Sequence, residues 1–140
     1  MSQPTDPQPL DLATTYLLLE PDGEALSLPF TPEFWPQLMS GAPTDPGIAR
    51  LAASTGRLLC VFPSEADWTS FERHPAGDEV LVLLTGSMTF TLETDPPQRV
   101  PLAPGQTCVV PRGVWHTADV HAPSRLLALT PGQGTEHRPR

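Results

Sequence analysis

The sequence contains no lysine, and all eight of its basic side chains are arginines. This absence excludes a Schiff base formed on lysine and a lysine general base. Acidic residues number 16, so the formal net charge is −8. A chain of this charge repels the phosphate backbone of nucleic acids and the surface of anionic lipids. We therefore expect neither a nucleic acid nor a membrane as a partner.

Cysteine is scarce, and long apolar runs are missing. Cys60 and Cys108 each lie within an apolar, strand-like run and lack the Cys-x2-Cys spacing of a zinc site, which predicts buried free thiols rather than a disulfide. No apolar run approaches the roughly 20 residues that a transmembrane helix needs, and the N-terminus is polar and acidic. These features predict a cytoplasmic protein.

The first half of the chain is punctuated by proline and glycine. Residues 1–12 are rich in proline, glutamine and aspartate and are expected to form a flexible tail. Strand-like segments at 16–20 and 24–29 flank Pro21-Asp22-Gly23, which predicts a β-hairpin. Short helices are expected near 32–40 and 48–54. This helical region carries a single cation, Arg50, which argues against a DNA-binding helix-turn-helix.

From Gly56 onward the pattern is that of strands. Eight short β-compatible segments are separated by glycine, proline or charged residues, at 58–62, 68–74, 79–84, 87–93, 99–102, 106–110, 116–121 and 125–130. Close-spaced strands of this kind predict an all-β, jelly-roll barrel. We expect one domain over residues 13–131, and a C-terminal tail over 132–140 that either folds over the barrel mouth or is disordered.

Two blocks in this region carry the chemistry. The first has His74, Glu79 and Gly86, and the second has Gly105, Pro111, Gly113 and His116. Their spacing resembles the two motifs of the cupin family, G-x5-H-x-H-x(3,4)-E-x6-G and G-x5-P-x-G-x2-H-x3-N, over about residues 58–130. Glu72 stands at the family's first histidine, Asp67 at its opening glycine and Val120 at its closing asparagine.

The resemblance implies a small double-stranded β-helix (jelly-roll) cupin barrel with a metal ion in its mouth. On this basis His74, Glu79 and His116 are the expected metal ligands. It does not imply one reaction, because the family includes dioxygenases, isomerases, epimerases, sensors and storage proteins.

Strand periodicity adds an independent argument about Glu72. Side chains alternate between the two faces of a strand, so Glu72 and His74 point the same way, as do His116, Ala118 and Val120. Glu72 is therefore expected inside the barrel, as a fourth metal ligand, a catalytic base or a hydrogen-bond partner of a substrate. His121 and His137 are expected to be exposed.

Imidazole and carboxylate ligands together suit one divalent ion of iron, manganese, nickel or zinc. Trp68, Ala118 and Val120 share the inward face, and Met88, Phe90 and Leu92 form another alternating face, which predicts a mostly apolar cavity. The expected ligand is a small organic molecule that chelates the metal through oxygen, and the expected function is dioxygenase-like. The alternative is a non-catalytic binding or sensing module whose metal site is decayed or absent. A homodimer is expected, because the N-terminal hairpin can pair with an edge strand of a second copy.

Overall fold

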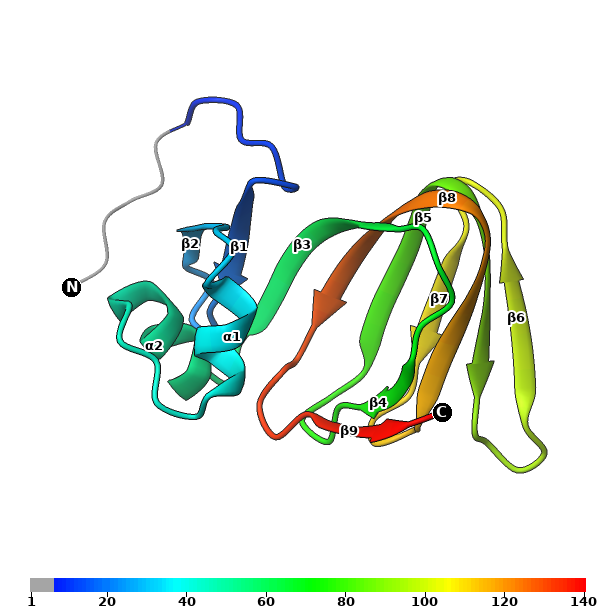
Figure 1. Ribbon diagram of the computed structural model, residues 1–140. Helices are drawn as coiled ribbons and strands as arrows, with labels where there is room; N and C mark the ends of the chain where they lie inside the picture. Colours follow the sequence, from blue (N-terminus) through cyan, green and yellow to red (C-terminus); the bar gives the residue numbers. More distant parts are fainter. Residues whose placement is uncertain (1–6) are drawn as a thin grey trace.

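Two long strands, β5 (Glu79–Leu92) and β8 (His116–Thr130), run through the whole barrel of the computed structural model, which describes residues 7–140 (Figure 1). They pair antiparallel along nearly their full length, from Val80 opposite Leu129 to Leu92 opposite His116. The register shifts between Leu83 and Met88. Because of these irregularities both strands bend there, and each half of the pair belongs to a different sheet.

One sheet is built around the first half of β5 and the second half of β8. β3 (Arg57–Ser64) pairs with β8, and β7 (Thr107–Val110) pairs with β5. The hairpin of β1 (Thr15–Leu19) and β2 (Ala25–Pro29) continues this sheet beyond β3. Its strand order is therefore β2-β1-β3-β8-β5-β7.

The other sheet is built around the remaining halves of the same two strands. β6 (Gln98–Leu102) pairs with β5, β4 (Ser70–Arg73) pairs with β8, and β9 (Glu136–Pro139) pairs with β4. The described strands do not close into a continuous hydrogen-bonded ring. Buried side chains such as Leu83, Phe90 and Leu126 fill the space between the sheets. The predicted all-β jelly-roll class is confirmed.

The sequence predicted two strands in place of each long one, and this boundary was wrong. Gly86 was interpreted as the end of a strand, but with φ +94° it forms part of the bend within β5. A Cβ atom at Gly86 would lie 2.2 Å from the Ser124 hydroxyl oxygen and 2.6 Å from the Pro123 carbonyl oxygen. Gly86 thus lets the two bent strands pass in direct contact.

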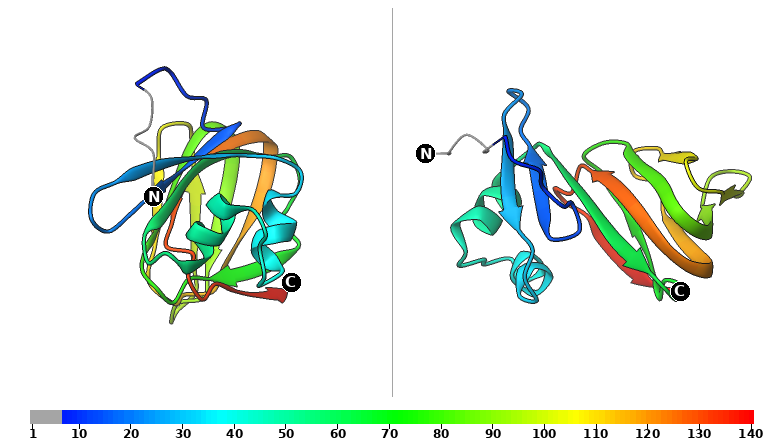
Figure 2. Two further views of the ribbon diagram at one scale, coloured as in Figure 1. Left: turned by 90° about the vertical axis from the view of Figure 1, so that its left-hand side faces the viewer. Right: turned by 90° about the horizontal axis from the view of Figure 1, so that it is seen from above.

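The two expected helices are present as α1 (Phe34–Met39) and α2 (Pro46–Ala53). The Asp45 carboxylate caps α2 by accepting hydrogen bonds from the backbone N–H groups of Gly47 and Ile48. Phe34 of α1 packs edge-on against Tyr16 of the hairpin, with ring centroids 5.1 Å apart. Figure 2 shows these helices and the hairpin as a lobe beside β3, next to the open end of the barrel.

The last residues of the chain are bound to the barrel. Residues 132–135 form a turn, and β9 lies along β4. An ion pair joins Arg73 to Glu136 at 2.8 Å, and the Arg138 guanidinium lies 4.7 Å from the centroids of both Phe71 and Trp115. The region expected as a tail over the mouth or as disordered chain therefore includes a paired strand.

At the other end, residues 1–6 of the expected N-terminal tail lie outside the described residues. The Leu12 carbonyl already accepts a hydrogen bond from the Val61 N–H at 3.1 Å. Across residues 7–140, no helix has both the length and the apolar character that crossing a bilayer requires.

The bend at Gly86 yields a test of the fold. Gly86 and Gly105 both have positive φ, but a Cβ at Gly105 would meet no atom within 4 Å. Gly105→Ala should cost about 1 kcal/mol of unfolding free energy through backbone strain alone. Gly86→Ala should cost about 3 kcal/mol, because a clash with β8 is added. Urea denaturation at unchanged m-value measures both losses, and equal losses would contradict the proposed contact.

Candidate metal centre

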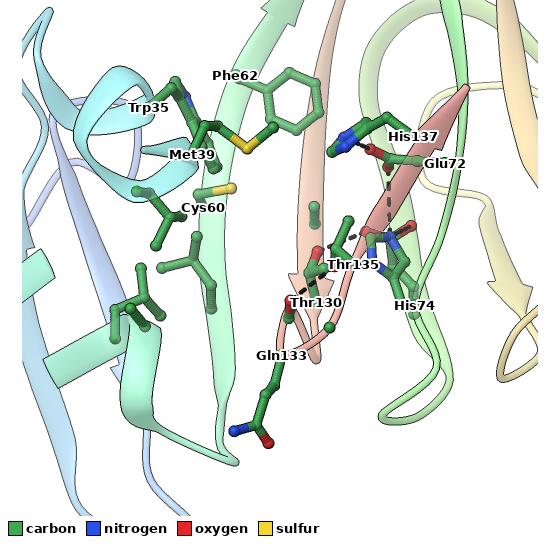
Figure 3. A pocket seen from close by; sticks show the side chains of 18 of the residues that line it. Trp35, Met39, Cys60, Phe62, Glu72, His74, Thr130, Gln133, Thr135 and His137 are labelled. Atoms are coloured by element: carbon green, nitrogen blue, oxygen red, sulfur yellow. Dashed lines mark hydrogen bonds and ion pairs between the residues drawn. The ribbon is translucent and has the colours of Figure 1, made fainter. Parts of the chain in front are cut away.

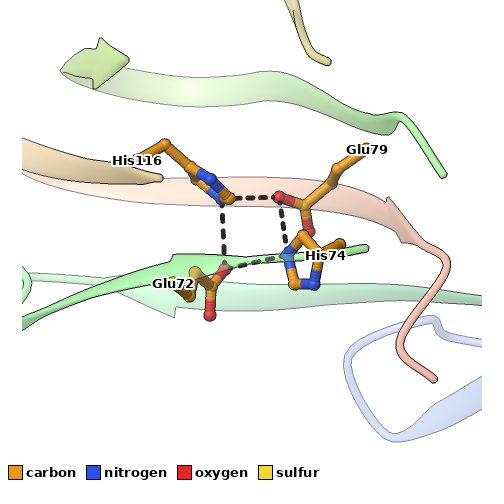
Figure 4. A group of neighbouring side chains, drawn as sticks. All are labelled: Glu72, His74, Glu79 and His116. Carbon is orange, nitrogen blue, oxygen red and sulfur yellow. Dashed lines mark hydrogen bonds and ion pairs between the residues drawn. The ribbon is translucent and has the colours of Figure 1, made fainter. Parts of the chain in front are cut away.

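Four side chains meet at the open end of the barrel (Figure 4). One ligand atom from each of Glu72, His74, Glu79 and His116 lies within 4.8 Å of all the others. The His74 Nε2 atom is 3.4 Å from Glu72 Oε1 and 3.3 Å from Glu79 Oε1. The corresponding distances from His116 Nε2 are 3.4 and 3.0 Å.

These residues meet because three strands begin or end at this point. Glu79 opens β5, His116 opens β8, and Glu72 is the direct cross-strand partner of His116. His74 follows the last residue of β4 and shares the face of Glu72, as the alternation of strand side chains predicted. The structure thus brings together all four residues that the sequence singled out as candidates.

Each imidazole is held by its outer nitrogen. His74 Nδ1 lies 2.8 Å from the Thr135 hydroxyl oxygen, and that hydroxyl donates its own hydrogen to the Gly132 carbonyl. Thr135 must therefore accept, so His74 carries its hydrogen on Nδ1. His116 Nδ1 likewise donates to the Val114 carbonyl at 3.0 Å. With Nδ1–H fixed in both rings, the lone pairs of a neutral pair sit on Nε2 and face the centre.

Each carboxylate is also held by one oxygen. Glu79 Oε2 accepts from the Thr130 hydroxyl at 2.5 Å, and Glu72 Oε2 lies 3.4 Å from His137 Nε2. The other oxygen of each carboxylate faces the two imidazoles. The two acids differ in exposure, because Glu79 is 3% exposed and Glu72 is 23% exposed. Glu72 is therefore the carboxylate that is more accessible to a molecule in the cavity.

One atom in this cluster lacks a hydrogen-bond partner, although two carboxylate oxygens lie within ion-pair distance of it. His74 Nε2 is buried, and none of its neighbours among the described residues meets the geometry of a hydrogen bond. A buried nitrogen without a partner is costly, and a cation between the four groups would satisfy it. The donor set of two imidazoles and two carboxylates is also one that Fe(II), Mn(II) or Zn(II) accepts. The residues present therefore fit a divalent metal ion.

The electrostatics of the cluster are those of two acid–base pairs. Burial lowers the pKa of both histidines, but contacts with the Glu72 and Glu79 carboxylates have the larger effect. The pKa of His74 is raised to about 9 and that of His116 to about 10. Burial raises the pKa of Glu72, and contacts with His116, His137 and His74 reverse this and hold it well below its usual range. The pKa of Glu79 is lowered in the same way, chiefly by His116 and His74.

Sequence reasoning missed the groups that hold the ligands from behind. Thr130, Thr135 and His137 all come from the end of β8 or from the C-terminal segment expected as a tail. His137 is 37% exposed, yet it is the cross-strand partner of Glu72 and contacts it. One sequence feature could have indicated them: Thr135 and His137 are two residues apart, the spacing that places side chains on one face of a strand, and they follow a glycine-rich turn. His121 is exposed and bonds Thr89 instead.

A cavity of about 940 Å³ opens onto the cluster (Figure 3). It is largely apolar, as predicted, and Trp68 lines it. Other residues expected to line it do not. Met88, Phe90, Leu92 and Ala118 are buried in the core, and Val120 packs against the core instead. The walls come instead from β3 and from the two helices, which the pattern of the strands alone could not place against the barrel.

Family comparison agrees with this geometry. The family model described as "Cupin domain" matches residues 58–130, which is more than half of the chain. This chain belongs to the cupin family. The match spans β3 to β8 and includes all four residues of the cluster, whereas the hairpin, the helices and β9 lie outside it. A comparison with curated proteins finds no match.

Solved structures with similar folds include a cupin-2 domain protein from Shewanella frigidimarina, at 19% identity and TM-score 0.45 over 60% of this chain and 71% of that one. Hydroquinone 1,2-dioxygenase from Sphingomonas sp. TTNP3 is 15% identical, with TM-score 0.46 over 57% of this chain and 62% of that one. Hydroxypropylphosphonic acid epoxidase from S. wedmorenis is 19% identical, with TM-score 0.47 over 59% of this chain and 46% of that one.

Thr135 yields a prediction about metal affinity. Thr135→Val removes the acceptor that orients His74, and we expect the affinity for Zn(II) to fall by about 10- to 100-fold. Thr135→Ser keeps the hydroxyl and should bind as the unchanged protein does. Competition with a chromophoric chelator measures both affinities, and thermal unfolding of the metal-free variants controls for general destabilisation. Equal affinity in the valine and serine variants would contradict this role.

The raised pKa values of the two histidines predict proton release. With pKa values of about 9 and about 10, both rings are protonated at pH 7.5 in the metal-free protein, and Nε2 must lose its proton to bind metal. Binding of one ion should therefore release about two protons, and the affinity should rise with pH until both values are passed. Calorimetry in buffers of different ionisation enthalpy counts these protons. Release of less than one proton per ion would contradict the assignment.

Proposed function

We propose that this cupin binds one divalent metal ion through Glu72, His74, Glu79 and His116 and acts on a small organic molecule that coordinates the ion through oxygen. The observation that carries the proposal is the arrangement of the four inward atoms. Each belongs to a side chain whose other polar atom already contacts a neighbouring group, and one of them, His74 Nε2, lacks a hydrogen-bond partner. A set fixed in this way is preorganised to hold an ion.

The donor set favours particular metals and chemistry. Two carboxylates make the centre harder and more anionic, which favours Fe(II), Mn(II) or Zn(II) and disfavours Cu(I). Nickel is compatible with imidazole ligands. Four protein ligands leave positions open toward the cavity for six-coordinate ions. A bound ion would supply Lewis acidity or, with iron or manganese, the redox chemistry of a dioxygenase-like reaction.

Glu72 is the residue we assign to proton transfer. It is the more exposed of the two carboxylates, and its Oε2 atom lies away from the cluster beside His137 Nε2. Because the pKa of Glu72 is lowered, it would accept a proton from a hydroxyl or enol that coordination to the ion had made more acidic. His137, being 37% exposed, offers that proton a way to solvent. Glu72 would thus act as ligand and base, two of the roles that the sequence left open.

A second candidate function rests on a specific observation. His116 Nε2 and Glu79 Oε1 are 3.0 Å apart, within the range of a direct hydrogen bond. As two imidazoliums and two carboxylates, the four residues form a neutral set without any metal. In that state the barrel would bind a small molecule without catalysis. The two functions predict different metal contents.

Metal content of the purified protein tests the proposal. Purification without chelator or metal-affinity resin, followed by elemental analysis, should find about one equivalent of Fe, Mn, Ni or Zn per chain. His74→Ala and His116→Ala should each lose it, because each removes a ligand. His121→Ala is the matched control, since this exposed histidine lies on β8 outside the cluster, and it should retain the ion.

The outcomes separate the two functions. Wild-type protein without metal, even after incubation with each ion, would overturn the proposal and leave the binding module. If about one equivalent of iron or manganese is found, oxygen uptake is measured with diketones and phenols as substrates. Glu72→Gln should lower turnover in these assays. Zinc alone leads to assays of hydrolysis and elimination.

A further inference from the structure

The cavity beside the cluster has two ends of opposite character (Figure 3). One end holds Glu72, His74 and Glu79, with His137 at its rim. The other end is formed by α1, α2 and β3, which contribute the apolar side chains of Trp35, Met39, Leu51 and Leu58. A molecule that filled both ends would have its polar atoms at the cluster and an apolar body against the helices.

Charge limits what the polar end can accept. The acidic and basic side chains that line the cavity, Glu72, His74, Glu79 and His137, all lie at the polar end, and no arginine is among the lining residues. The carboxylates of Glu72 and Glu79 balance the charge of a divalent ion. A neutral or singly charged group adds at most one negative charge to this site. A dianionic phosphate would add two, without the arginine that phosphate recognition normally uses.

The apolar end is exposed to solvent, and the cavity that it belongs to is large enough to hold a ligand of substantial size. Met39 is 63% exposed and Trp35 is 40% exposed, whereas Leu58 is buried and Leu51 is partly buried. Covering such surface with an apolar group is favourable. The cavity volume of about 940 Å³ lies near the upper limit of about 1,000 Å³ for pockets that take drug-sized molecules. A ligand no larger than a short organic acid would leave most of it unfilled.

We infer that the ligand of this cavity is elongated, with one neutral or monoanionic oxygen-donor head at the cluster and an uncharged apolar tail against α1, α2 and β3. This inference rests on the proposed function, because the head is defined by the metal. It adds the class of molecule: an amphipathic compound with a single polar end, and not a sugar nucleotide, a phosphate ester or a small polar acid.

A chain-length series tests the inference. Zinc-loaded full-length protein is titrated calorimetrically with straight-chain hydroxamates from acetohydroxamate to octanohydroxamate, which share one oxygen-donor head. The dissociation constant should fall roughly threefold to fourfold for each added methylene. Octylphosphonate has a similar tail with a head of higher charge and should bind at least about tenfold more weakly than octanohydroxamate.

Variants at Met39 locate the tail. Met39→Glu places a charge at the apolar end on an exposed position of α1, and it should weaken octanohydroxamate at least about tenfold more than acetohydroxamate. Met39→Leu is the matched control and should keep the slope of the series. An unchanged slope in Met39→Glu would overturn the placement of the tail.

The remaining outcomes distinguish this inference from the proposed function. If acetohydroxamate binds but the series is flat, the inference fails and the metal site stands. If the protein holds no zinc, the series is run with whichever of iron, manganese or nickel it holds. If it holds none of these ions, the proposed function fails and the inference with it. Equal dissociation constants in metal-free and zinc-loaded protein would overturn the arrangement of head and tail, because the head would then not be bound by the ion. If light scattering shows octanohydroxamate splitting a dimer, the apolar end is an interface between copies, and the inference fails.

Discussion

The site depends on how the outer atoms of four side chains are held. His74 is bonded to Thr135, His116 to the Val114 carbonyl and Glu79 to Thr130, while Glu72 contacts His137. Without these contacts the two carboxylates and two imidazoles would be free to rotate away from a common centre. With them, one atom of each side chain is directed inward. As a result, one buried nitrogen, His74 Nε2, has no hydrogen-bond partner among the described residues. A metal ion bound at the centre would give this nitrogen a partner.

The fold supplies these contacts through two bent strands. β5 and β8 each pass from one sheet into the other, so Glu79 and Thr130 lie near one end of the pair while His116 opens the opposite end of β8. The curvature of the barrel brings these ends to one mouth, where β4 and β9 complete it. The contact of Gly86 with Pro123 and Ser124 allows the bend. The need for a glycine at position 86 is therefore linked to the geometry of the candidate metal centre, whose residues come from both ends of the long strands.

The sequence was sufficient for the class of fold and for the inward residues. Alternation placed Glu72 with His74, and motif spacing selected Glu79 and His116. It was insufficient where the outcome depends on pairing between distant segments. Glycine and proline near residues 86 and 123 were interpreted as turns, because a bend shared by two strands has the same local composition as two strand ends. Thr135 and His137 were missed because a short polar segment acquires its role only by pairing with β4. The contribution of α1 and α2 to the apolar walls was missed for the same reason. An amphipathic pattern shows that one face of a helix is buried, but it does not show which surface covers that face.

The glutamate at position 72 and the apolar cavity are two parts of one electrostatic arrangement. A histidine at this position, as in the family motif, would leave a divalent ion with a single carboxylate and a net positive charge. With Glu72 the two carboxylates would balance a bound divalent ion, so the proposed centre would be formally neutral. A neutral centre costs less to place beside an apolar wall than a charged one, because less solvation is lost. It also attracts anions less strongly, which agrees with a cavity that has no arginine in its lining. In the proposed centre, the departure from the family pattern would thus shift selectivity away from polyanions and toward molecules that combine a weakly charged oxygen donor with apolar surface.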